Sequence, residues 1–224
     1  MVGDLVVQGL REIERKKDDV KDGDTSSAEL AERMTRLGQG LEAEKRFTEA
    51  AAHYSEALRI DPSFALASFR AGNLALRLGD YATAIPFLQH ASELVPGHAA
   101  THFLLSKAYY KIGDYTAALA AAESTLLYDP SHSGAAIQRI RCLSELGHWT
   151  RILEITSQIP DHLIDSVEVA LLRCLALAKL GHREQARTVL FSIGELGKKR
   201  FPAIVKNIEI ELQRDGNPGQ IDAE

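Results

Sequence analysis

One feature of this sequence limits the possible folds more than any other: a pattern that returns every 34 residues. Gly79, Gly113, Gly147 and Gly181 follow this period, and Lys45 lies one period upstream of them. The residues two positions further on are, in order, Phe47, Tyr81, Tyr115, Trp149 and Arg183. Chance does not keep several features in phase over five periods. The pattern therefore predicts tandem copies of one short unit instead of a single large core.

Within a unit the apolar residues follow a helical spacing. Phe69, Gly72 and Leu76 lie on one side of a predicted helix, which Gly79 ends. Asp80 is the predicted N-cap of a second helix, which stops before Pro96, and Asp114 takes the same place one period later. Each unit is therefore predicted as two antiparallel helices joined by a tight turn. Small residues recur where these helices would cross, namely Gly38, Gly72, Ser106, Ala84 and Ala118.

The flanking segments fit a stack of helix pairs, whose exposed ends need covering. Ser26 and Glu29 form a predicted capping box at the start of the first repeat helix. Residues 4–20 are predicted as a charged helix that either caps the stack, fills its groove or docks elsewhere. Phe201-Pro202 opens a predicted capping helix over 201–214, and residues 215–224 are expected to be a disordered acidic tail.

These repeats resemble the tetratricopeptide repeat family. The residues that carry the resemblance in the first three units are Leu37-Gly38, Ala50, Tyr54, Ala57, Pro62, Ala71-Gly72, Ala84, Ala91, Pro96, Leu105-Ser106, Tyr109, Ala118 and Pro130. The fourth unit keeps Gly147 and Trp149, and the fifth keeps Gly181 and Ala186. The resemblance implies an all-α, right-handed α-solenoid of antiparallel helix pairs. After an N-terminal segment over 1–27, the repeat region would span 28–200, with units at 31–64, 65–98, 99–132, 133–166 and 167–200.

Composition narrows the functional classes. The formal charge is -5, and the acidity lies in the two ends of the chain, which argues against a surface built for nucleic acid. Cys142 and Cys174 are the only cysteines, so no disulfide framework is expected. No signal peptide and no run of about 20 apolar residues is present, so we expect a cytoplasmic protein without membrane insertion.

Motifs for catalysis are missing from the sequence. It contains no GxSxG, HExxH or GxxxxGK[ST] motif. His98 and His102 have the spacing of metal ligands on one helix, but no cysteine or acid joins them, so we interpret them as polar surface residues. Cys142 and Cys174 are interpreted as inert packing residues. We therefore expect no enzyme activity, no cofactor and no metal.

The resemblance also implies a binding surface. In the family, positions 2, 5, 9 and 12 of the first helix of each unit face a concave groove. An apolar stripe around Phe69 and Phe103 would run beside amide and cationic donors. The predicted partner-binding residues are Gln39, Phe69, Asn73, Leu76, Phe103, Lys107, Tyr110, Ile137 and Arg141. Alternatively, the two phenylalanines pack only between repeats. The lysine and asparagine pattern by which some relatives grip chaperone tails is not present.

The sequence thus predicts a non-enzymatic adaptor or scaffold that binds an extended peptide or a helix of a partner protein. Two alternatives stay open. The chain could be an accessory or regulatory subunit of an enzyme or of a secretion or assembly machine. It could also self-associate into a structural scaffold. The sequence does not identify the partner.

Overall fold

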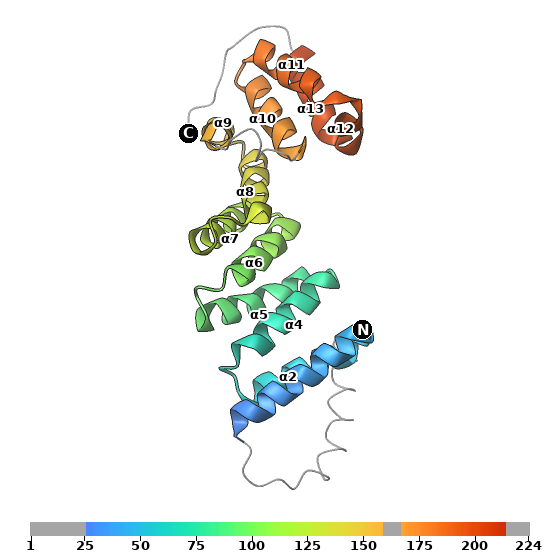
Figure 1. Cartoon of the computed structure of the whole chain (residues 1–224), viewed down its shortest axis with the longest axis vertical. Helices are drawn as coiled ribbons and strands as arrows, with labels where there is room; N and C mark the ends of the chain where they lie inside the picture. Colours follow the sequence, from blue (N-terminus) through green and yellow to red (C-terminus); the bar gives the residue numbers. More distant parts are fainter. Residues whose placement is uncertain (1–25, 159–166, 214–224) are drawn as a thin grey trace. The chain divides into compact units, whose positions relative to one another are not determined.

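A computed structural model describes residues 26–158 and 167–213 of the chain (Figure 1). All regular structure in these two ranges is helical, which confirms the predicted all-α class. The chain divides into two compact units, Met1–His132 and Ser133–Glu224. The predicted helix over 4–20 and the predicted tail over 215–224 lie outside the described residues.

The first unit contains three helix pairs: α2 (Ser27–Ala43) with α3 (Phe47–Ile60), α4 (Ala65–Arg77) with α5 (Tyr81–Leu94), and α6 (Ala99–Ile112) with α7 (Tyr115–Tyr128). The two helices of each pair pack along each other. The second helix of one pair also packs against the first helix of the next, and α4 contacts both α2 and α6. The first helices therefore form one continuous row within this unit (Figure 1).

Short-range hydrogen bonds set where these helices begin. The side chain of Asp80 accepts a hydrogen bond from the backbone N–H of Thr83, at 3.1 Å, and Asp114 accepts one from Ala117, at 3.0 Å. Ser26 and Glu29 form the reciprocal capping box. All three predicted helix starts are confirmed, because each depends only on residues three positions apart.

Small residues let the paired helices approach closely, as the sequence predicts. A Cβ atom on Gly38 would lie 2.6 Å from Cε1 of Tyr54. At the same repeat position Ser106 is fully buried, and its hydroxyl donates to the carbonyl oxygen of Ala118, at 2.8 Å. The facing alanines Ala84 and Ala118 have no exposed surface. Small residues at the crossing points thus lie in close contact with the facing helix.

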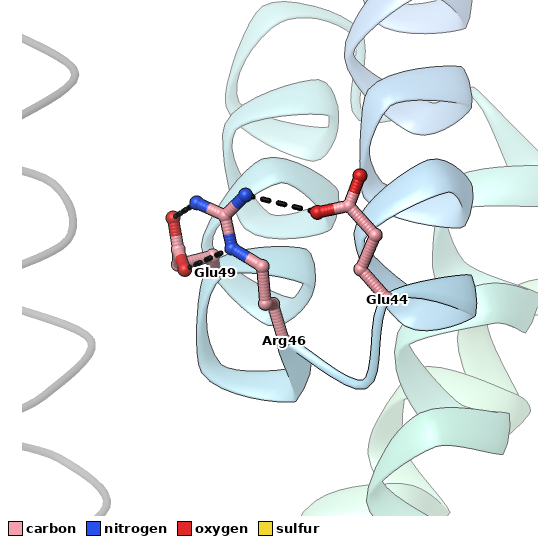
Figure 2. A network of polar contacts seen from close by, with 3 residues as sticks. All are labelled: Glu44, Arg46 and Glu49. Carbon is pink, nitrogen blue, oxygen red and sulfur yellow. Dashed lines mark hydrogen bonds and ion pairs between the residues drawn. The ribbon is translucent and has the colours of Figure 1, made fainter.

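The turn between α2 and α3 carries a polar network (Figure 2). The guanidinium of Arg46 forms a fork with the carboxylate of Glu49, at 2.7 and 2.5 Å, and reaches Glu44 at 3.0 Å. These hydrogen bonds, above all those to Glu49, raise the pKa of Arg46. All three side chains are exposed, so we expect the network to order the turn more than to stabilise the fold.

The second unit contains α8 (Ser133–Glu145), α9 (Trp149–Gln158), α10 (Val167–Lys179), α11 (Arg183–Ser192), α12 (Gly194–Arg200) and α13 (Pro202–Gln213). α12 begins at Gly194, which has a φ of 71°. The last helix packs against α10. Val205 and Ile208 of α13 share one buried cluster with Leu171 and Leu175 of α10.

Candidate partner-binding surface

The predicted binding residues lie on the first helices of the pairs. Gln39 lies on α2, three residues lie on α4 and three on α6, all in the first unit. Ile137 and Arg141 lie on α8, in the second unit.

On α4, the two apolar residues and the amide differ in their surroundings. Phe69 and Leu76 are half-buried and pack against a core cluster that includes Leu88 and Leu105. Phe69 also meets the ring of His98 edge to face, at 5.0 Å between centroids. Part of the Phe69 side chain is therefore buried by packing between helix pairs. The side-chain amide of Asn73 makes no hydrogen bond with any residue in the described part of the chain.

On α6, an aromatic ring and a cation lie together outside that core cluster. The ring of Phe103 lies 4.4 Å from the ring of His132, and the ammonium of Lys107 lies over Phe103, 5.7 Å from its centroid. Lys107 is exposed and forms no ion pair with a described residue. One turn further along, Tyr110 contacts the ring of Tyr115 edge to face, at 5.3 Å.

At the α2 end of the row, a carboxylate that the sequence analysis did not single out is already occupied. Glu42 accepts hydrogen bonds from the hydroxyl of Tyr54 and from the guanidinium of Arg77, the latter at 2.5 Å. Arg77 also lies over the ring of Phe47, at 5.6 Å. Burial, followed by the hydrogen bond to Glu42, raises the pKa of Tyr54. Glu42 therefore joins the first two helix pairs instead of facing a partner.

In the second unit the predicted donor has an internal partner. The guanidinium of Arg141 forms two hydrogen bonds with the carboxylate of Glu168 on α10, at 2.5 and 2.6 Å. Ile137, one turn before Arg141, is half-buried. Glu168 is not among the binding residues predicted from the sequence. Glu168 stands at position 2 of the fifth unit, and Arg141 stands at position 9 of the fourth. An acidic residue at the first of these positions and a basic residue at the second is the sequence signal that could have identified the pair.

The matching positions of the fifth unit are also covered. Leu171, Leu175 and Ala178 stand at the positions that face the groove in the family, and they are buried in the cluster that α13 completes. Lys179 and Glu211 add an ion pair between these two helices, at 2.6 Å. The chain's own last helix therefore covers the face of α10 that carries these positions.

The histidines and cysteines singled out in the sequence have local partners. His98 bonds the hydroxyl of Thr101 at 2.7 Å, and His102 bonds the carbonyl of Pro96 at 2.7 Å. Cys142 and Cys174 are buried free thiols, and burial raises the pKa of each to about 11. In the described ranges, three or more metal-ligating side chains do not gather at any point. None of the described helices is both long enough and apolar enough to span a membrane.

Comparison with known families identifies the repeats. Two family models, each described as tetratricopeptide repeat, match residues 35–99 and residues 75–130. Residues 35–130 of this chain are tetratricopeptide repeats. No curated protein matches its sequence.

Solved structures of tetratricopeptide repeat proteins share the fold. YrrB, described as a tetratricopeptide repeat protein with an unusual peptide-binding site, is 20% identical, with a TM-score of 0.67 over 91% of this chain and 97% of its own. MamA is 16% identical, with a TM-score of 0.67 over 84% and 97%. The first tetratricopeptide repeat domain of Spaghetti (RPAP3), solved with the HSP90 peptide SRMEEVD, is 17% identical, with a TM-score of 0.53 over 56% and 99%. At these identities the likeness concerns the fold, which is an α-solenoid.

Proposed function

We propose that this tetratricopeptide repeat protein is a non-enzymatic adaptor that binds a segment of a partner protein along α4 and α6 of its first unit. The observation that carries the proposal is Lys107 lying over the ring of Phe103 without a carboxylate partner in the described chain. An exposed cation beside an apolar ring offers a partner both a charge contact and an apolar anchor.

The neighbouring helix supplies a matching donor. Asn73 on α4 takes the same repeat position as Lys107 on α6, and its amide also lacks a hydrogen-bond partner among the described residues. An amide can pair with the backbone of an extended peptide, whereas an ammonium suits an acidic group. The partner we expect is therefore an extended peptide or a helix with an apolar residue near Phe103 and an acidic residue near Lys107.

Two further facts support a peptide as the partner class. YrrB is described as having a peptide-binding site, and the Spaghetti domain was solved with a peptide. In the second unit, by contrast, Arg141 already binds Glu168 of the same chain, and α13 already covers α10. We therefore place the binding surface on the first unit.

A pull-down from the native cell with the full chain as bait tests the proposal. Phe103→Ala combined with Lys107→Glu should reduce recovery of the partner at least about tenfold, because hot-spot rings and charges carry much of a binding energy. Leu127→Ala is the matched control, since Leu127 is exposed on α7 and is not one of the predicted binding residues of α4 and α6. Equal recovery by wild type and the double variant would refute the proposal, provided that circular dichroism shows both to be folded.

The proposal includes a cytoplasmic location. It is supported by the two buried free thiols, which leave the described chain without a disulfide. Fractionation of the native cell tests it directly. Recovery of the chain with secreted material would contradict it.

A further inference from the structure

In the second unit, an acidic residue of the chain itself, Glu168, binds the donor Arg141. Arg141 stands at repeat position 9, the place that Asn73 and Lys107 take in the first unit. Of these three donors, Arg141 alone has a bidentate carboxylate partner among the described residues. Glu168, at position 2 of the following helix, provides it.

Arg141 holds the carboxylate of Glu168 in the geometry with which an arginine binds a carboxylate ligand. Both nitrogens on one edge of the guanidinium, Nε and Nη2, donate to the two carboxylate oxygens, at 2.5 and 2.6 Å. The side chain of Glu168 is 13% exposed and that of Arg141 is 39% exposed. A fork of this kind is how arginine holds a carboxylate from another chain. Glu168 therefore occupies the contact that a partner's acidic side chain would make.

The first unit provides an internal comparison. Position 2 opposite Gln39 is Leu66, and position 2 opposite Asn73 is Ala100. Neither of these residues carries an acceptor on its side chain. The donors of the first unit thus remain open, whereas the donor of the second unit is taken by the chain itself.

We propose that Glu168 is a specificity-determining residue, which keeps Arg141 from binding an acidic side chain of a partner and so directs acidic segments to the first unit. The inference rests on the proposed function, because it assumes that the first helices of the pairs present a binding surface. It commits to one ligand chemistry, the carboxylate of a peptide side chain. Glu168 acts by taking the two N–H groups of Arg141 that such a carboxylate would need.

The test follows the Arg141 Nε–Hε resonance of the full, ¹⁵N-labelled chain during titration with an oligo-aspartate peptide at low salt. Glu168→Ala removes the carboxylate and leaves alanine at repeat position 2, the residue type that Ala100 provides in the first unit. We expect it to bind the peptide through Arg141 about tenfold more tightly than wild type does. Oligo-asparagine should not shift the resonance. Adding Arg141→Gln to the variant removes the reporting resonance, so the affinity of that chain for oligo-aspartate is measured by calorimetry, which should show the gain abolished.

Glu168→Gln keeps the size of the side chain. It replaces the alanine variant in the titration if the alanine variant does not fold. It should show part of the gain, because an amide binds a guanidinium less strongly than a carboxylate does. Equal affinity of wild type and the folded variants overturns the inference. Loss of the fold in both variants also overturns it, since the pair is then structural.

Failure of this inference can be told apart from failure of the proposed function. The oligo-aspartate titration uses no natural partner and reads a resonance of the second unit. The pull-down reads the natural partner through variants of the first unit. A null titration together with partner loss in the Phe103→Ala, Lys107→Glu chain would reject the role of Glu168 and keep the adaptor function.

Discussion

A Cβ atom placed on Gly72 would lie 2.6 Å from Cγ of Leu88, so these two residues set how closely α4 and α5 approach. The same atom would lie 3.2 Å from the carbonyl oxygen of Ala84. A backbone atom cannot rotate away as a flexible side chain can. The crossing point that the sequence predicted at Gly72 is therefore a point where even one methyl group does not fit.

Gly72→Ala should lower the free energy of unfolding by about 1–3 kcal/mol, because the added methyl overpacks the crossing. Gly40→Ala is the matched control: Gly40 also lies inside a helix, but its Cβ would meet nothing within 4 Å. That variant should gain about 0.5–1 kcal/mol. Urea denaturation measures both. Equal stabilities of the two variants would contradict the packing account.

Lys45→Gly should raise the free energy of unfolding by about 1 kcal/mol. Lys45 has a φ of 63° at the turn position where the other units have glycine, and a side chain is costly in this region. Lys45→Ala separates the backbone effect from the charge, since it keeps the strained φ and should gain much less. Gly113, with a φ of 84°, gives the reverse test, because Gly113→Ala should destabilise the fold. A gain from Lys45→Ala equal to that from Lys45→Gly would point to charge instead.

Cys174→Ser should fold with a loss of less than about 1 kcal/mol. The thiol of Cys174 donates to the carbonyl of Ala186 at 3.1 Å, and Ser106 makes the same contact with Ala118 two units earlier. A hydroxyl in this place therefore keeps its acceptor and avoids the cost of an unpaired buried donor. Thermal denaturation checks this outcome, and a loss of several kcal/mol would show that the two crossings are not equivalent.

The same variant tests a pH dependence. Burial raises the pKa of the Cys174 thiol from its ordinary value of 9.0 to about 11, so the folded state keeps a proton that the unfolded state releases. This contribution to stability is fully present below pH 9.0 and is lost as the pH rises towards 11. The stability advantage of wild type over Cys174→Ser should therefore decline across that window. A constant difference would contradict it.

Glu42 and Arg77 should be coupled by about 1 kcal/mol in a double-mutant cycle with Glu42→Gln and Arg77→Met. The arginine is half exposed, which limits the gain, whereas the carboxylate is 11% exposed and also binds Tyr54. Glu42→Leu should cost more than Glu42→Gln, because it leaves the buried hydroxyl of Tyr54 without an acceptor. Chemical denaturation of the four chains measures the coupling. Additive effects would show that the pair does not join the first two helix pairs.

Much of the fold could be predicted from the sequence because its signals are local. Asp80 and Asp114 cap helices through bonds to residues three positions away, and Gly113 ends a helix through its own φ. The placement of Phe69, Phe103 and Lys107 on successive first helices followed from the period alone. What the period could not show is how each side chain is used. Phe69 is partly taken up by the core, whereas Lys107 remains open.

The sequence by itself determined the repeating helix pair, its turns, its caps and its crossing residues, because each depends on contacts within a single unit of 34 residues. Only the tertiary structure decided that Glu168 takes Arg141 and that α13 fills the face of α10. Both outcomes depend on side chains 27 residues or more apart, which meet only once the helices are packed. The packing also leaves the side chains of Asn73 and Lys107, both in the first unit, without a hydrogen-bond or ion-pair partner among the described residues.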